Sequence, residues 1–275
     1  MKPARFDYVR ADDLTEVHAV LAEHGNAARI VAGGQTLLPM LSMRLVRPEV
    51  VVDIMHLPVL RGIEAGKKDI RIRAGVRQAE LLAWPDIAAA LPLLAVALPW
   101  VGHAQTRSRG TVCGSIAHAD PSAEIPLVLL ALDGAVELSS RRRRRRTTAT
   151  SFFTGMMSTE RLDDELIESV VIPKTRPGHG YAFQEFGRRH GDFAIVSCAA
   201  ICAQDSIRLA LGGVADRPMA RDFPALDGDA LNDALDEFAW ELDARDDLHA
   251  TARYRRDLVR QMGRATIEEA RRWRA

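Results

Sequence analysis

The chain has 275 residues, of which 47% are hydrophobic and 27% charged, and its 37 Lys and Arg balance 37 Asp and Glu. This length accommodates one large or two modest domains, and the zero formal net charge gives no general attraction to nucleic acid or membranes. An amino-terminal segment without an apolar core and the lack of any run of about 18 apolar residues predict a cytoplasmic protein without a membrane span. Three cysteines are too few for the four thiolates of an ordinary iron–sulfur cluster.

The amino-terminal part predicts a helix, a strand, a helix and a strand. Asp12 and Asp13 are suited to cap a helix whose apolar residues recur at helical spacing, and Gly25 ends it. A sharp turn at Gly33 and Gly34 follows the first strand. The two strands are expected at residues 28–32 and 50–54. The second helix is expected at 36–45 and has a proline in its first turn.

The middle of the chain mixes short helices and strands. Residues 102–120 are rich in Gly, Ser, Thr and His and are interpreted as an ordered loop. Asp120 is suited to cap a helix over 121–132, with Pro121 at its first position. Two further helical pieces are expected at 79–82 and 87–98, and strands at 69–74, 135–140, 147–153 and 166–172.

The carboxyl-terminal part begins after residues 173–180, which have the composition of a linker. Three antiparallel strands are expected at 181–186, 195–203 and 207–211. Two helices with apolar stripes then back this small sheet. The stripes consist of Leu231, Ala234, Leu235, Phe238 and Leu242, and of Tyr254, Leu258, Met262 and Ala265.

Two glycine-containing loops are candidates for binding a phosphate group, at residues 31–36 and 109–115. A diphosphate needs backbone N–H donors at close range, and glycine allows both the approach and unusual dihedral angles. Hydroxyl groups of Thr36, Thr111 and Ser115 add donors. The alternative is that both segments are tight turns without a ligand, since one short motif alone is weak evidence.

A dinucleotide-binding Rossmann site is the main rival for the first loop. Strand, glycines, helix and strand are followed by Asp53, about twenty residues after the glycines. However, the loop does not contain GxGxxG, and Pro39 interrupts the helix that would receive the pyrophosphate. A Rossmann site also leaves residues 102–120 without a role, so this interpretation ranks second.

Several stretches, in the same order along nearly the whole chain, resemble the medium, FAD-binding subunit of molybdenum hydroxylases. The two longest are VAGGQTLLPMLSMRLVRPEVVVDI and TRSRGTVCGSIAHADPSAEIPLVLLALDGAVEL; the others are FFTGMMST, DELIESVVIP, FGRRHGDFAIVS, LALGGVADRPM and TARYRRDL. The family includes aerobic carbon monoxide dehydrogenase and the flavin portion of xanthine dehydrogenase. The resemblance implies an α+β fold: a PCMH-type FAD-binding domain over 1–175, with subdomains about 1–57 and 58–175, and a small domain over 176–275 built from the three-stranded sheet and its helices.

The resemblance also implies which residues hold FAD. The family's first FAD loop corresponds to Ile30, Val31, Ala32, Gly33, Gly34, Gln35, Thr36 and Leu37, and its second to Thr111, Val112, Cys113, Gly114 and Ser115. Further flavin contacts are implied at Val101, Glu124, Ile167 and Gln184. At Gln184 this chain departs from relatives that have Lys. Asp192 is expected either near the flavin or in a structural role.

Cys113 stands where many relatives have glycine. If this position requires a positive φ, the Cβ atom costs about 1 kcal/mol and the loop is reshaped. A redox role for the thiol and a small buried filler are the two interpretations, and the filler is favoured.

Two other features are interpreted without a ligand. Arg141 to Arg146 form a run of six arginines between two expected strands; without interleaved aromatic residues it is expected to be a solvated turn, in contact with an acidic partner surface, rather than a nucleic-acid site. His118, Asp120 and Glu124 could form a metal site. Since first-row metals usually bind more than one histidine, no metal is expected.

The implied function is electron relay, with no catalytic side chain on this subunit. A large subunit with the molybdenum cofactor oxidises the substrate, a small subunit with iron–sulfur clusters conducts the electrons, and FAD here passes them to an external acceptor. The three chains are expected as a dimer of heterotrimers. Alternatives are a stand-alone flavin enzyme, an NAD-dependent dehydrogenase and an assembly subunit that binds no flavin.

Overall fold

The computed structural model describes residues 2–274, and its amino-terminal sheet is parallel. Parallel strands need crossover connections, which helices supply. The strand order is β1-β3-β2. The elements are β1 (Asp7–Arg10), α1 (Leu14–His24), β2 (Ala28–Val31), α2 (Leu37–Ser42) and β3 (Val50–Asp53). The predicted order of helix, strand, helix and strand is confirmed, and α2 is shorter than expected because Met43 ends it.

The second sheet has five antiparallel strands in the order β4-β5-β10-β6-β7. The strands are β4 (Ile63–Ala65), β5 (Asp69–Arg73), β6 (Ala135–Ser139), β7 (Arg144–Thr148) and β10 (Leu166–Pro173). The central β10 is buried from Leu166 to Ile172, as expected for a strand covered on both faces. A small hairpin, formed by β8 (Phe153–Gly155) and β9 (Ser158–Thr159), precedes β10 in the sequence.

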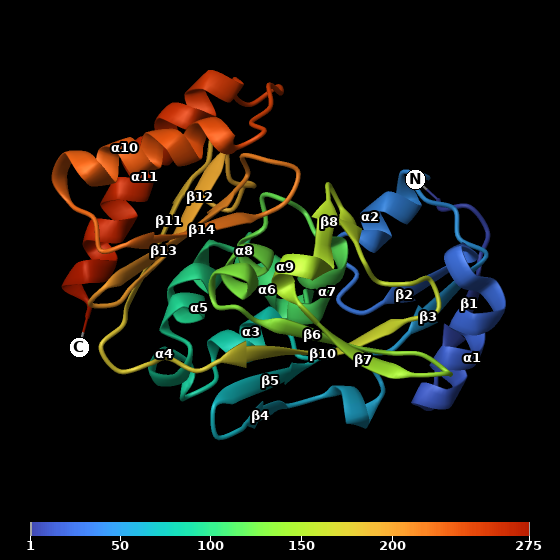
Figure 1. Ribbon diagram of the computed structural model, residues 1–275. Helices are drawn as coiled ribbons and strands as arrows, with labels where there is room; N and C mark the ends of the chain where they lie inside the picture. Colours follow the sequence, from blue (N-terminus) through green and yellow to red (C-terminus); the bar gives the residue numbers. More distant parts are fainter. Residues whose placement is uncertain (1, 275) are drawn as a thin grey trace.

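Short helices cover the five-stranded sheet and contribute a large part of the first hydrophobic core (Figure 1). The most buried is α8, in which every residue is buried. The short helices are α3 (Gln78–Leu82), α4 (Ile87–Ala90), α5 (Pro92–Ala97), α6 (Ala104–Arg109), α7 (Val112–His118), α8 (Glu124–Ala131) and α9 (Ala149–Phe152). Single turns of 3₁₀-helix lie at Gly25–Ala27, Pro58–Leu60 and Leu98–Trp100.

The carboxyl-terminal sheet has four antiparallel strands, so the prediction of three was wrong. The missed strand lies at the sheet edge, carries Arg221 and Asp222, and has only one buried residue. It lacks the apolar alternation by which strands are recognised in a sequence, so it was not predicted. The elements are β11 (Gly180–Phe186), β12 (Val196–Cys202), β13 (Ser206–Gly212), β14 (Met219–Pro224), α10 (Gly228–Glu241) and α11 (Ala252–Arg272).

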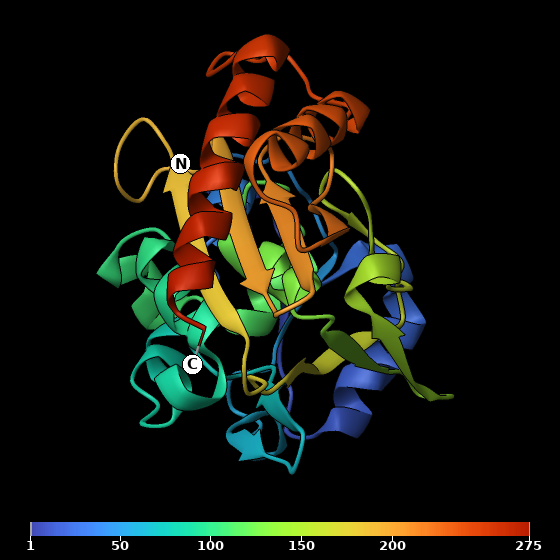
Figure 2. The same cartoon turned by 60° about the vertical axis from the view of Figure 1, so that its left-hand side comes forward.

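The two faces of this sheet pack against different cores. Side chains alternate along a strand: Tyr181 and Phe183 of β11 join the first core, whereas Ala182 joins the second core with α10 and α11. Figure 2 shows α11 lying across one face of the sheet, and α5 and α8 contact the other. The position of a residue in this alternation therefore decides which core its side chain reaches.

The prediction that 102–120 is a loop was wrong, because α6 and α7 lie within it. The oxygen Oγ1 of Thr111 caps α7 by accepting a hydrogen bond from the N–H of Gly114 at 3.0 Å. A Cβ atom at Gly114 would lie 2.7 Å from that oxygen. Glycine here permits a helix cap, although in the sequence it indicates a loop.

Two other predicted boundaries were also wrong. The helix expected from residue 121 begins at Glu124. Asp120 is not its cap, because its Oδ1 accepts a hydrogen bond from the N–H of Ser122 at 2.8 Å and closes a local turn. The strand expected over 147–153 is replaced at Ala149 by α9, which the side chain of Thr148 caps.

The buried face of α11 differs from its predicted apolar stripe. Ala265 of that stripe is exposed and Tyr254 is 43% exposed. The buried residues are Arg255, Val259, Gly263, Thr266, Ile267 and Ala270. Two of these, Arg255 and Thr266, are polar and form hydrogen bonds, which include those from Arg255 to the carbonyl oxygens of Ile195 and Gly213, each at 2.6 Å. The α10 stripe is confirmed, except that Ala234 is only half-buried.

Candidate functional site

The two glycine-containing loops are in direct backbone contact. A Cβ atom at Gly33 would lie 2.3 Å from the carbonyl oxygen of Arg109 and 2.7 Å from the Cα of Gly110. Atoms at these distances overlap, so only glycine permits the contact. The structure therefore brings together two segments that are more than seventy residues apart in the sequence.

The first loop offers free hydrogen-bond donors. Within residues 2–274, no acceptor in the chain receives a hydrogen bond from the backbone N–H groups of Gly33, Gly34, Gln35, Thr36 or Leu37. Gly34 has a φ of 69°, in the left-handed region, which turns the chain between β2 and α2. Consecutive N–H groups in such a turn form a concave site for an anion. The loop thus has the chemistry that a diphosphate requires.

Most backbone N–H groups of the second loop already donate hydrogen bonds within the chain. The N–H groups of Gly110, Val112, Gly114 and Ser115 donate to Thr106, Val76 and Thr111. Beside this loop, the buried Oε1 of Gln78 has no hydrogen-bond partner and would lie 3.1 Å from a Cβ atom at Gly110. An unpaired buried acceptor is costly. Gln78 is therefore a candidate for accepting a hydrogen bond from a ligand hydroxyl group, and the sequence did not indicate it.

Cys113 is a buried filler of the helix α7. It is 3% exposed, its φ is not positive, and its Sγ donates to the carbonyl oxygen of Ile72 at 3.7 Å. Burial raises the pKa of its thiol to about 12. The condition for backbone strain, a positive φ, is therefore not met at this position, and a thiol that remains protonated has little redox reactivity.

The other predicted contact residues do not all face the loops. Val101 and Ile167 are buried in the first core, and Glu124 is the first residue of α8. Gln184, however, lies on the face of β11 that α11 covers, and its Nε2 donates to Oε2 of Glu269 at 2.9 Å. The flavin contact at Gln184 stays a prediction, and in this structure the side chain is engaged with Glu269 of α11.

The adjacent Glu185 lies on the opposite face of β11 from Gln184. Because side chains alternate, Glu185 shares with Phe183 the face of β11 that is turned toward the first core. Burial and the negative charge of Glu124 raise the pKa of Glu185 to about 8. The alternation of side chains along this strand, in which the apolar Phe183 faces the first core, could have indicated from the sequence that Glu185 lies on the same face.

The arginine run forms part of a hairpin whose charges are met by carboxylates of the same chain. Arg143 and Arg145 lie 3.5 and 2.7 Å from Oε1 of Glu165, and Arg144 lies 3.4 Å from Oε1 of Glu168. Arg144 to Arg146 belong to β7, so the run is only partly a turn. Three of the six arginines therefore have carboxylate partners within the chain.

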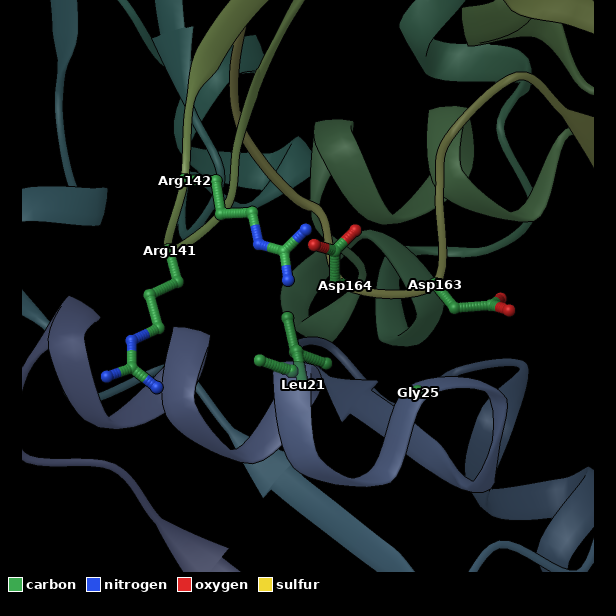
Figure 3. A pocket seen from close by; sticks show the side chains of 7 residues that line it. Leu21, Gly25, Arg141, Arg142, Asp163 and Asp164 are labelled. Carbon is green, nitrogen blue, oxygen red and sulfur yellow. The ribbon is translucent and has the colours of Figure 1, made fainter.

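The turn of this hairpin lines a hollow of about 700 Å³ between α1 and the segment before β10. Figure 3 shows the side chains of Arg142 and Asp164 pointing toward one another, while that of Arg141 extends along α1. None of the predicted FAD contacts lines the hollow. It is a charged surface feature, separate from the glycine-containing loops.

We expect Glu165→Gln to change how the stability depends on pH. Burial by itself raises the pKa of Glu165, but the hydrogen bonds from Arg145 outweigh it and the pKa lies below its usual value. The ionised carboxylate then stabilises the fold above its unfolded pKa of about 4.3, and this contribution is lost as the pH falls through the folded-state pKa. Thermal unfolding should show the variant less stable by about 1–2 kcal/mol at pH 7 and the difference shrinking toward about pH 3.

The matched control is Glu237→Gln, which removes a carboxylate from a surface pair with Arg221. Exposed pairs contribute about 0–1 kcal/mol. A difference between wild type and Glu165→Gln that stays constant from pH 7 to acid would contradict the assignment.

No group of three or more His, Cys, Asp or Glu side chains in the described chain could hold a metal ion. Nε2 of His118 lies 4.0 Å from Oδ2 of Asp120, a distance that fits a loose ion pair only. Also within residues 2–274, no helix is both long and apolar enough to cross a membrane.

Free backbone donors beside a close contact of two glycine-containing loops define a protein that binds a cofactor with a diphosphate group. A family model described as the FAD binding domain in molybdopterin dehydrogenase matches residues 4–175, and the CO dehydrogenase flavoprotein C-terminal domain matches residues 181–270. The chain is 37% identical to 6-hydroxypseudooxynicotine dehydrogenase complex subunit alpha of Paenarthrobacter nicotinovorans, over 98% of this chain and 96% of the relative.

Two further comparisons agree. Nicotine 6-hydroxylase medium subunit of the same organism is 38% identical, over 88% of this chain and 89% of the relative. The structure of reconstituted CO dehydrogenase from Oligotropha carboxidovorans matches with a TM-score of 0.95 and 30% identity, covering all of both chains. The chain therefore belongs to the family of FAD-binding medium subunits of molybdenum hydroxylases, and it is an FAD-binding oxidoreductase subunit.

Proposed function

We propose that the chain is the electron-transfer subunit of a molybdenum hydroxylase complex. It receives electrons from a small iron–sulfur subunit, which is reduced by a large subunit with the molybdenum cofactor, and passes them to an external acceptor. Bound FAD supplies the redox chemistry. The protein binds the cofactor, orients it and sets the electrostatics around it.

The observation that carries this proposal is the set of free N–H groups from Gly33 to Leu37, held against the backbone of Arg109 and Gly110. We infer that these N–H groups bind the diphosphate of FAD. Thr111, whose hydroxyl caps α7, positions the second loop rather than donating freely. The side chains of Val112 and Cys113 are buried, so only their backbone atoms are available to the cofactor.

The division of the chain supports the same proposal. We infer an FAD-binding domain over residues 1–175, made of subdomains about 1–57 and 58–175, and a smaller domain over 176–275. The three-stranded and five-stranded sheets lie in the first part and the four-stranded sheet in the second. The glycine-containing loops come from different subdomains, so FAD would bind where the two subdomains meet.

The cysteines support the proposal that the iron–sulfur clusters lie on another chain: this chain has three, all buried in the described structure. Cys113 lies in the first core, and Cys198 and Cys202 lie in the second. They cannot converge on one cluster, which needs four thiolates. We therefore infer that the clusters reside on a partner chain; two relatives are named as a complex subunit alpha and a medium subunit, which agrees with a multi-subunit assembly.

Purification of the tagged full chain from its native host tests the proposal. We expect the absorption bands of oxidised flavin, together with an iron–sulfur chain and a molybdenum-containing chain that co-purify. Substrate should reduce the flavin only when all three chains are present. A colourless chain that cannot be reconstituted with FAD would disprove the proposal, and flavin reduction by substrate in the isolated chain would favour a stand-alone enzyme instead.

A further inference from the structure

Gln78, the first residue of α3, lies directly against the second glycine-containing loop. Its backbone N–H donates to the carbonyl oxygen of Gly110 at 2.8 Å. The N–H of Val112 donates to the carbonyl oxygen of Val76 at 3.1 Å, so the segment before α3 pairs with the loop as two short strands would. The side chain of Gln78 reaches the same glycine, because a Cβ atom at Gly110 would lie 3.1 Å from its Oε1 and 3.2 Å from its Cδ.

The first glycine-containing loop lies against Gly110 as well. A Cβ atom at Gly33 would lie 2.7 Å from the Cα of Gly110. Gly33 is also the first residue of the run of free backbone N–H groups that continues to Leu37 in the described structure. Because glycine has no side chain, Gly110 keeps its two neighbours close together. A single residue therefore separates the amide of Gln78 from the loop that we assign to the diphosphate.

The amide of Gln78 is buried without a use inside the fold. Its residue is 5% exposed, and its Oε1 has no hydrogen-bond partner in the described structure. A buried polar group without a partner destabilises a protein, whereas an apolar side chain of similar shape would not. The terminal torsion of a glutamine has broad preferences, so the amide can turn toward a neighbouring ligand while the rest of the side chain stays in place.

We propose that Gln78 is a cofactor-binding residue whose amide forms a hydrogen bond with a hydroxyl group of FAD beside the diphosphate. This inference rests on the proposed function and adds a residue to the same site. FAD carries hydroxyl groups on both sides of its diphosphate, on the ribityl chain toward the flavin and on the ribose toward the adenine. An amide both donates and accepts, so it suits a hydroxyl group of either sugar. The bound cofactor then supplies the partner that the fold does not provide.

Gln78→Met tests the proposal in the full chain, because methionine has a similar shape and lacks the amide. Without FAD, the variant should unfold at the wild-type temperature or higher, since it removes an unpartnered buried group. With FAD, it should bind about tenfold more weakly in a flavin fluorescence titration, as the loss of one hydrogen bond predicts. An amide that served only the fold would instead lower the unfolding temperature when it is removed.

Titrations with ADP and FMN identify the sugar that provides the hydroxyl group. ADP retains the ribose and the diphosphate, whereas FMN retains the ribityl chain. Weaker binding of ADP alone would assign the amide to the ribose, and weaker binding of FMN alone would assign it to the ribityl chain. The control Gln261→Met changes an exposed glutamine of α11 in the same way and should bind all three ligands as wild type does.

Two results would overturn the inference and leave the proposed function intact. The first is wild-type affinity of Gln78→Met for FAD. The second is a variant that unfolds at a markedly lower temperature or does not fold, which would assign the amide to stability. In both cases the wild-type chain still binds FAD. A wild-type chain that cannot be reconstituted with FAD would instead disprove the proposed function and the inference together.

Discussion

Gly33→Ala should weaken FAD binding about a hundredfold, which corresponds to about 2.7 kcal/mol. The added Cβ atom would lie 2.3 Å from the carbonyl oxygen of Arg109, so the two glycine-containing loops must separate. The added atom would also lie 2.7 Å from the Cα of Gly110. Both of these atoms belong to the backbone, so they cannot move aside as a flexible side chain would. Separation displaces the N–H groups from Gly33 to Leu37, and a misplaced donor no longer matches the diphosphate. Flavin fluorescence titration of the apoprotein measures the change.

Gly155→Ala is the matched control, because no atom lies within 4 Å of a Cβ atom at Gly155 and its φ is not positive. This variant should bind FAD as wild type does. If Gly33→Ala retained wild-type affinity while unfolding at the wild-type temperature, the contact between the loops would have no role in binding. A lower unfolding temperature with unchanged affinity would assign Gly33 to stability alone.

The glycine-containing loops could be recognised in the sequence, but their contact could not. Gly33 and Gly34 follow a strand of buried residues, and Thr111 precedes a helix, so each segment carries a local signal. The contact between Gly33 and Arg109 depends on how two sheets with separate strand orders pack together. Periodicity reports which face of an element is apolar, and it does not report which distant element covers that face.

Gln184 and Glu185 show how a single position changes the interpretation of a site. The resemblance to the family carried the flavin contact to Gln184, whereas the alternation of β11 places Gln184 beneath α11 and Glu185 toward the first core. A shift by one residue in a strand moves a side chain to the opposite face. Pairing with β12 fixes this register, and that pairing is a tertiary property.

The buried face of α11 was mispredicted for a related reason. Of the apolar stripe expected at Tyr254, Leu258, Met262 and Ala265, only Leu258 and Met262 pack against the second core, and both are half-buried. The helix also buries the polar residues Arg255 and Thr266. Hydropathy patterns assign charged residues to the surface. A guanidinium group can nevertheless be buried where carbonyl oxygens and a carboxylate satisfy its donors, and these acceptors come from segments far away in the sequence.

Arg255→Met should therefore destabilise the chain by about 3 kcal/mol or more, as hydrogen bonds to charged groups contribute about 1.5–3 kcal/mol each. The 4% exposed Arg255 donates to the carbonyl oxygens of Ile195 and Gly213, each at 2.6 Å, and its Nη2 donates to Oδ2 of Asp247 at 2.5 Å. Methionine fills similar volume but leaves these acceptors without a donor. Urea unfolding of the purified chain measures the loss.

The control is Arg253→Met, on the same helix, where the side chain is exposed and makes no hydrogen bond in the described structure. Such surface changes usually stay within about 0.5 kcal/mol. Arg255→Lys separates charge from geometry, because a lysine keeps the positive charge but lacks the planar fork that reaches several acceptors at once. If Arg255→Lys were as stable as wild type, charge alone would explain the burial. If Arg255→Met were also as stable, the hydrogen bonds from α11 to the carbonyl oxygens of Ile195, just before β12, and Gly213, just after β13, would contribute nothing to the fold.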